Sequence, residues 1–150
     1  MIQQAVPPLA DLYEADETAW LETMSELIGQ GRLADLDYPH LAEYLADMAK
    51  RDRREVESRL KILMTHLLKW RYQPAQRSRG WQASIIHQRQ ELEGCLGRGI
   101  LLNHAEAVLA SVYAKAVELA SAETGLPASS FPAECPYTLD QLLAAELPAE

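Results

Sequence analysis

The fold is decided by residues 38–72, which read YPHLAEYLADMAKRDRREVESRLKILMTHLLKWRY. Apolar side chains recur in this stretch at steps of three, four or eight residues, the spacing of one face of an α-helix. Asp37 just before it can cap free backbone amides, and Pro39 lies where its missing N–H costs nothing. No glycine or proline follows before Pro74. We therefore predict one long helix from about Tyr38 to Tyr72, whose apolar positions are Leu41, Leu45, Met48, Val56, Leu60, Leu63, Leu67 and Trp70.

The length of this helix raises a question about its path. A helix of this many residues is about 50 Å long, whereas a compact domain of this size is about 40 Å across. Either the helix bends, or one end projects and packs on a second subunit. Asp52 falls in the gap of the apolar stripe, inside the charged run at residues 50–54. We expect the helix to leave the core or bend there.

The remaining helices are predicted from amphipathic spacing and from their start and stop residues. Strand signals are absent throughout, so the predicted fold is all-α: an antiparallel bundle of four main helices with one long central helix and a short C-terminal helix. Residues 1–8 are predicted to form a flexible tail and residues 9–150 a single domain. Besides the long helix, we expect helices at about 9–28, from Ser78 to Leu96, from Asn103 to Thr124, and at 139–145.

The composition is that of a soluble globular protein, with 48% apolar and 24% charged residues among 150. No run approaches the ~18 apolar residues that a membrane span needs, and the first residues do not resemble a secretory signal. We therefore predict a cytoplasmic location and no membrane association. The two cysteines form no Cys-x-x-Cys pair, so thiols are expected.

Charge is distributed unevenly along the chain, whose net charge is −8. Residues 1–49 carry ten acidic and one basic side chain, residues 50–98 five acidic and twelve basic, and residues 99–150 seven acidic and one basic. Pairing of the cationic middle with the anionic flanks is the interpretation we favour. The alternative is a basic face left open for an acidic partner or nucleic acid. Nucleic acid is not favoured, because a chain with a pI near 5.0 is repelled overall by phosphate backbones.

Several short motifs are specific enough to suggest a family. They are His66-Leu67-Leu68-Lys69-Trp70, Tyr72-Gln73-Pro74, Ser78, Trp81, the Asp16/Trp20 pair, Leu41-Ala42-Glu43, Phe131-Pro132 and Cys135-Pro136-Tyr137. Together they resemble the bacterial family catalogued as domain of unknown function 29, over about residues 12–143. The resemblance implies an all-α fold. It implies no activity, cofactor or catalytic residue.

The end of the long helix and the start of the next one supply the candidate binding residues. Basic and aromatic side chains alternate there, which is how single-stranded nucleic acid is held by charge and stacking. The same mixture arises when tryptophans wedge a helical hairpin and arginines lie across their rings. A histidine beside a lysine could also serve as a base with an electrostatic partner, although cations at a helix C-terminus are favoured by the backbone dipole. The candidates are His66, Lys69, Trp70, Arg71, Arg77, Arg79 and Trp81.

A candidate metal site is formed by His40, Glu43 and Asp47, which project from one helix face at i, i+3 and i+7. Solvated helix faces produce the same spacing by chance, and metal sites in bundles draw ligands from several helices. No catalytic motif or phosphate-binding glycine loop appears. We therefore assign no catalytic residue and no cofactor.

These observations predict a non-catalytic protein that associates through helical surfaces, as a small cytoplasmic adaptor or regulator. Its partner would be a second copy of the chain, in the simplest case as a dimer, or another protein. One alternative is a nucleic-acid-associated module that uses the basic segment 50–98. Another is a metal-binding protein or an enzyme built on His40, Glu43 and Asp47 or on His66.

Overall fold

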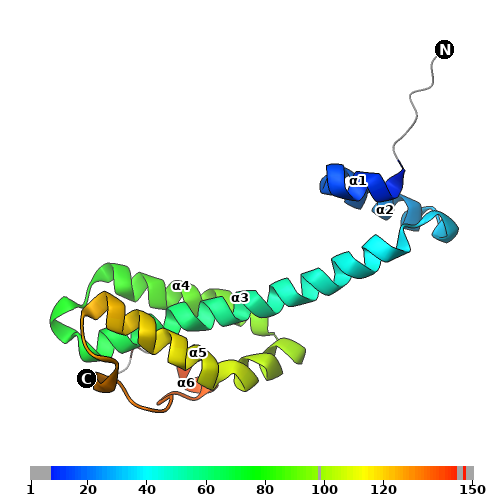
Figure 1. Ribbon diagram of the computed structural model, residues 1–150. Coiled ribbons are helices and arrows are strands. Elements are labelled where there is room, and N and C mark those ends of the chain that lie inside the picture. Colours follow the sequence, from blue (N-terminus) through cyan, green and yellow to red (C-terminus); the bar gives the residue numbers. More distant parts are fainter. Residues whose placement is uncertain (1–7, 98, 145–146, 148–150) are drawn as a thin grey trace. The chain divides into compact units, whose positions relative to one another are not determined.

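The computed structural model describes residues 8–97, 99–144 and 147, and these residues form helices and no strand. The α-helices are α1 (Leu9–Ala15), α2 (Glu17–Gly29), α3 (Tyr38–Tyr72), α4 (Arg79–Leu96), α5 (Ile100–Thr124) and α6 (Leu139–Leu143) (Figure 1). Short 3-10 turns lie at η1 (Leu33–Asp35), η2 (Pro74–Gln76) and η3 (Ala128–Ser130). The prediction of an all-α helical bundle with one long central helix is confirmed.

Contacts divide the chain into two compact units, residues 1–50 and residues 51–150, and the boundary falls inside α3. Unit 1 holds ten acidic and two basic side chains, a net charge of −8, whereas unit 2 holds twelve of each. All of the chain's net negative charge therefore belongs to unit 1. The prediction of one domain over residues 9–150 stays a prediction, and the predicted tail lies outside the described residues except for Pro8.

Unit 1 differs from the prediction at its start, where the single helix expected over residues 9–28 is two helices. The backbone breaks at Asp16 (φ −154°, ψ 86°), whose side chain accepts a hydrogen bond from the backbone N–H of Ala19 at 3.1 Å. An aspartate that caps a new helix offers the backbone an alternative to continuing the old one. The prediction was wrong because it did not treat Asp16 as a helix cap.

The core of unit 1 is built around Trp20, which is fully buried, and Met24 and Leu27 are also buried. Its indole ring contacts Tyr13 edge-on at 4.8 Å and Tyr44 at 5.9 Å. Its Nε1–H donates to the Asp37 carboxylate at 3.1 Å. This bond joins α2 to the residue that precedes α3.

The long helix has the predicted bounds, Tyr38 to Tyr72. None of its residues before Val56 is buried, whereas seven between Val56 and Leu68 are. The basic run around Asp52 is mostly exposed. Burial on α3 therefore begins at Val56. This is just after Asp52, where we predicted from the gap in the apolar stripe that the helix leaves the core.

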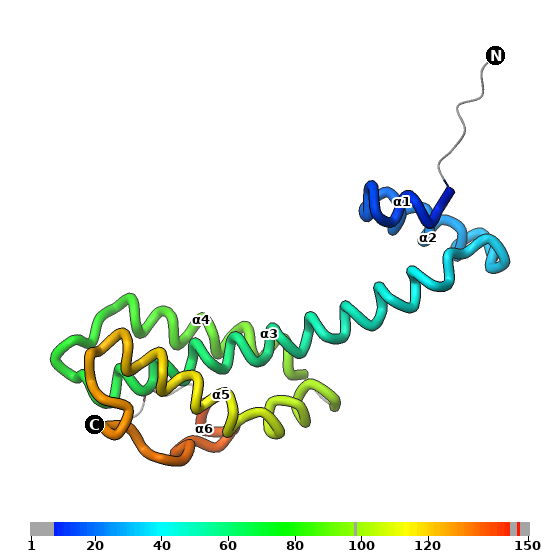
Figure 2. Tube along the Cα trace, in the orientation of Figure 1, coloured from blue at the N-terminus to red at the C-terminus, as the bar shows by residue number. Residues whose placement is uncertain are grey.

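Unit 2 is a bundle of the second part of α3 with α4, α5 and α6. The chain trace shows α4 running antiparallel to this part of α3, and α5 then returning in the direction of α3 (Figure 2). Ser78, where the start of a helix was predicted, caps α4 and accepts a hydrogen bond from the Trp81 N–H at 3.2 Å. The fully or nearly fully buried core includes Val56, Leu60, Leu63, Met64, Leu67, Leu68, Ile85, Leu92, Leu96, Ala105, Val112, Tyr113, Ala116, Ala120, Phe131, Leu139 and Leu142.

The ends of α5 and α6 test the predicted bounds of these helices. The start expected at Asn103 was wrong: α5 begins at Ile100 after Gly99, whose φ of 80° suits glycine. Its end at Gly125, with φ 75° in the left-handed region, is confirmed. α6 begins at Leu139 as predicted, and Thr138 and Gln141 form a capping box there. No helix of the described residues is long and apolar enough to cross a membrane.

Candidate functional site

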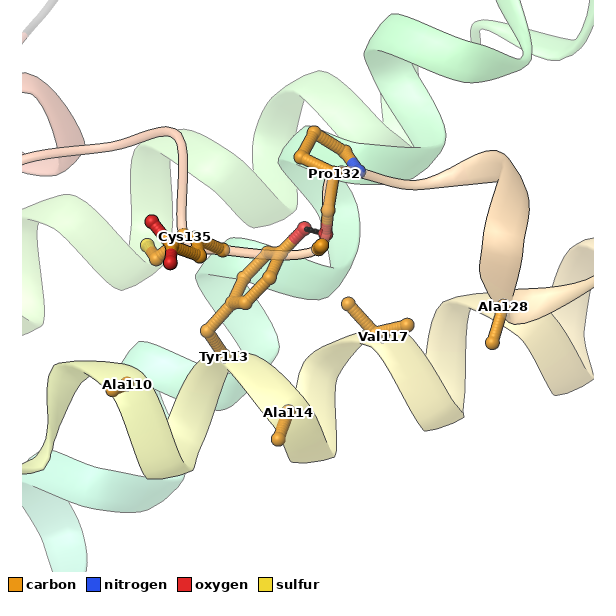
Figure 3. Close-up of a pocket in the computed structure, with 9 residues that line it drawn as sticks. Ala110, Tyr113, Ala114, Val117, Ala128, Pro132 and Cys135 are labelled. Atoms are coloured by element: carbon orange, nitrogen blue, oxygen red, sulfur yellow. Dashed lines mark hydrogen bonds between the residues drawn. The ribbon is translucent and has the colours of Figure 1, made fainter.

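A pocket of about 560 Å³ lies between α5 and the segment that follows it, residues 126–138 (Figure 3). We call it the α5 pocket. Most of its lining consists of short or apolar side chains, with Glu134 as the lining carboxylate. Its volume is in the range of small-molecule and side-chain binding pockets. The lining residues are Ala110, Tyr113, Ala114 and Val117 from α5, and Ala128, Pro132, Ala133, Glu134 and Cys135 from the following segment.

The segment that closes the pocket is fixed to the bundle at several points. The Tyr113 hydroxyl donates to the Pro132 carbonyl at 2.5 Å (Figure 3). Phe131 is buried and packs edge-on against Tyr72 at 5.3 Å. The Ser121 hydroxyl donates to the Leu126 carbonyl at 2.6 Å. The pocket is thus held open in the folded protein, and a ligand would not have to order its walls.

The titratable groups of the α5 pocket suit binding better than proton transfer. Burial raises the pKa of Tyr113 to about 12, so its hydroxyl is neutral and already bonded. Burial also raises the pKa of the Cys135 thiol, which lowers its thiolate fraction and hence its nucleophilicity. No histidine, lysine or serine belongs to the described lining. The arrangement therefore offers an apolar cavity with one acidic side chain.

The basic and aromatic candidates at the α3–α4 connection interact with each other. The Lys69 ammonium lies 4.6 Å from the centre of the Trp81 ring and donates to Glu123 on α5 at 2.8 Å. Arg77 lies 4.9 Å from the centre of the Trp70 ring, and its Nε–H donates to the Trp70 carbonyl at 2.8 Å. Cations thus occupy ring faces that a nucleic-acid base would need. This geometry supports the structural interpretation of the cluster.

The other binding candidates are used locally or lie at the surface. The Nδ1–H of His66 donates to the Ile62 carbonyl one turn earlier at 2.9 Å. Arg71 is exposed and lies 5.5 Å from the centre of the Tyr72 ring. Arg79, the first residue of α4, is also exposed. The described contacts therefore bring Lys69 to Trp81 and Arg77 to Trp70, but gather no single site from all seven candidates.

The metal candidate gains no support from the geometry of unit 1. His40 Nδ1 lies 2.7 Å from Oδ2 of Asp37, and the His40 ring stacks on the Tyr13 ring with the ring centres 4.2 Å apart. Glu43 and Asp47 are exposed. Among the residues that the structure describes, no group of three or more His, Cys, Asp or Glu side chains is placed to hold a metal ion.

Comparison with protein families gives one result. The model of the family described as "Domain of unknown function DUF29" matches residues 12–147. The chain belongs to this family. The match confirms the family suggested by the motifs around Trp70 and extends four residues beyond the predicted end, but membership carries no activity. No curated protein and no solved structure matches the chain.

The α5 pocket is the feature that sequence reasoning missed. One set of small residues on α5, Ala105, Ala116 and Ala120, is buried in the core. Ala110 and Ala114, four residues apart on another face, line the pocket. A second small-residue face on one helix was a signal that could have indicated it. The path of residues 126–138 over that face could not be predicted from spacing.

Proposed function

We propose that the protein is a non-catalytic interaction protein, and that the α5 pocket receives an apolar side chain of a partner protein. The observation that carries this proposal is the pocket itself, an apolar cavity of about 560 Å³ whose walls are fixed by hydrogen bonds and ring packing. Anchor residues of protein partners fill such preformed pockets and supply much of the binding energy. A cytoplasmic location is part of this proposal.

The partner's anchor is expected to be apolar with a cationic neighbour. Short side chains such as Ala114 and Ala133 leave the space that a leucine or an aromatic ring would occupy. Glu134 lines the pocket and can pair with a lysine or arginine beside the anchor. The neutral Tyr113 and Cys135 place no charge against the anchor, so its burial there leaves no ion unpaired.

Filling the pocket tests the proposal. Ala114→Trp places an indole at the pocket lining, and Ala122→Trp adds the same indole at another exposed position of α5. Binding of an apolar fluorescent dye and cross-linking of protein partners in cell extract are measured for both variants. Ala114→Trp is expected to reduce dye binding and to remove a cross-linked partner, while Ala122→Trp retains both. Equal dye binding and equal partners in the two variants would contradict the proposal.

We propose that exposed apolar residues of unit 1 form a second interaction surface, which binds another copy of the chain or a further protein. Ile28, Leu33, Tyr38 and Leu45 are 48% to 59% exposed. Tyr38 and Leu45 are seven residues apart on α3 and share one helix face, and the Tyr38 hydroxyl donates to the Leu33 carbonyl at 2.6 Å. Leu33, Tyr38 and Leu45 are linked in this way, and contiguous exposed apolar groups are typical of interaction surfaces.

The mass of the protein in solution tests self-association. Leu45→Glu adds a carboxylate to this surface, and Leu119→Glu does the same at an exposed leucine of unit 2. We expect light scattering to give an oligomer that Leu45→Glu weakens and Leu119→Glu does not. A monomeric wild-type protein at micromolar concentration would assign the surface to a different protein partner.

A further inference from the structure

We propose that unit 2 carries a binding site for a phosphate monoester group, formed by Arg54, Ser58 and Lys61 of α3 together with Lys115 of α5. These side chains line a pocket of about 160 Å³, whose other lining residues are Glu57 and Val112. This basic pocket shares no lining residue with the α5 pocket. The proposal is therefore independent of the function proposed above.

The basic pocket combines side chains from two helices that are distant in the sequence. Arg54, Ser58 and Lys61 are spaced i, i+4 and i+7, so they project from one face of α3. Lys115 reaches the same pocket from α5, and it is the single lysine or arginine among residues 99–150. Its presence here is informative, because the same segment holds seven acidic residues. Cations from α3 and α5 are thus brought together where the local sequence is otherwise acidic.

The cations of the basic pocket have no carboxylate partner among the described residues. The ion pairs of unit 2 between described residues join Arg59 to Glu55 and Glu91, Lys69 to Glu123, and His104 to Glu57. Arg54, Lys61 and Lys115 enter none of them. The lining holds three cations and one carboxylate, Glu57, so it carries a net positive charge. The like charges repel one another, and an anion in the pocket would relieve that repulsion.

The ligand's chemistry follows from the donors and the space. Guanidinium and ammonium groups donate charge-assisted hydrogen bonds to phosphate oxygens, and a serine hydroxyl can add another. A pocket of about 160 Å³ equals the liquid volume of about five water molecules, which admits a phosphoryl head group. Glu57 lies at the same pocket, but its Oε1 is 3.8 Å from Nε2 of His104, an imidazole that can offset its charge when protonated. Buried Val112 supplies an apolar floor.

The overall acidity of the chain does not oppose such a site. Unit 2 has no net charge, because all of the excess of carboxylates belongs to unit 1. The ligand can come from two sources with the same chemistry, a small phosphate ester or a phosphorylated side chain. A nucleic-acid backbone is a different ligand, since its diesters lack the dianionic terminal group.

Titration of isotope-labelled protein at low salt, followed by NMR, tests the proposal with phenyl phosphate as the probe. Saturable shifts are expected at the amides near Lys61 and Lys115. Lys61→Gln and Lys115→Gln should each weaken binding about tenfold, as for loss of one charged hydrogen bond. Arg79→Gln removes one exposed positive charge outside the pocket and should leave binding unchanged. All three positions lack a buried polar role, so folding should be retained.

Further probes distinguish a phosphorylated side chain from a small phosphate ester as the source of the ligand, and they define the results that would overturn the proposal. Tighter binding of a phosphoserine peptide than of phenyl phosphate would support a phosphorylated protein as the source, and equal binding would support a small ester. Methyl sulfonate, a monoanion, is expected to bind more weakly than either. Non-saturating shifts, or equal weakening by Arg79→Gln and Lys115→Gln, would overturn the proposal. Tighter binding of a single-stranded oligonucleotide without a terminal phosphate would also overturn it.

Discussion

Replacement of Asp37 by alanine would remove the carboxylate that joins α2 to α3 in unit 1. One oxygen, Oδ2, accepts from Trp20 Nε1 at 3.1 Å and lies 2.7 Å from His40 Nδ1. The other, Oδ1, faces the backbone N–H of His40 at 3.5 Å, in the first turn of α3. The Asp37 side chain is only 8% exposed, so water cannot readily replace it. The variant leaves the indole N–H of the fully buried Trp20 without this partner.

The size of the effect follows from these contacts. A hydrogen bond to a charged group contributes about 1.5–3 kcal/mol, and loss of a helix cap costs about 1 kcal/mol. Because the contributions share one carboxylate and overlap, we expect Asp37→Ala to lower the free energy of unfolding of unit 1 by about 3 kcal/mol. Asp35→Ala is the matched control. Asp35 pairs with Arg32 at 2.9 Å, but both side chains are more than half exposed, and exposed pairs contribute less than about 1 kcal/mol.

Urea denaturation followed by tryptophan fluorescence measures this difference. The chain has three tryptophans, and a background with Trp70→Phe and Trp81→Phe leaves Trp20 as the reporter of unit 1. The transition of Asp37→Ala is expected at a clearly lower urea concentration than that of Asp35→Ala. If the two variants unfold together, the carboxylate does not hold α2 to α3 and the reasoning fails.

The same residue predicts a pH dependence. Burial acts to raise the pKa of Asp37, but hydrogen bonds from His40 and Trp20 outweigh it and lower the pKa below its ordinary value of 3.8. A lowered pKa in the folded state contributes stability above the unfolded-state value, and this contribution is lost as the pH falls through the folded-state value. Unit 1 of the wild type should therefore lose stability on acidification below about pH 4. Asp37→Asn, which cannot ionise, should lose less over the same range.

Three further predictions concern unit 2. Arg89→Met should lower the free energy of unfolding by about 1–3 kcal/mol, measured by chemical denaturation. The reason is that the buried Arg89 donates a hydrogen bond to the Leu142 carbonyl at 2.7 Å and so holds α6 to α4. A change below about 0.5 kcal/mol, the size of a surface substitution, would contradict this. Gly125→Ala should destabilise the protein by about 1–2 kcal/mol, because φ is 75° at this position. Gly94→Ala within α4 should instead stabilise it by about 0.5–1 kcal/mol, because an added Cβ meets nothing within 4 Å there. Thermal denaturation of both variants checks that the two effects have opposite signs. Burial raises the pKa of the thiols of Cys95 and Cys135. Both thiols should therefore react with a disulfide reagent more slowly at pH 7 than in the unfolded chain, and faster as the pH rises. Cys135 lines the α5 pocket, and its rapid reaction at pH 7 would contradict the raised pKa.

Local sequence signals predicted the elements well where one residue has one structural role. The bounds of α3 followed from Asp37, Pro39 and an apolar spacing without interruption. The start of a helix at Ser78 was predicted correctly because a short polar side chain before a periodic run has few other uses. Asp16 and Asn103 were misassigned for the opposite reason. Each of these two residues fits both a helix interior and a helix start. The alternative helix starts differ little in free energy, so contacts with neighbouring residues decide which one forms.

The sequence by itself determined that the chain is helical, where its long helix runs, and to which family it belongs, because periodicity, caps and motifs are local properties of neighbouring residues. Only the tertiary structure decided how these elements combine: that Trp20 has its own core in unit 1, that Lys69 meets Glu123, and that Lys115 joins Arg54 and Lys61. Both pockets draw their lining from segments more than ten residues apart in the chain. Their existence depends on how whole helices and the segment 126–138 pack, and no spacing rule within one element contains that information.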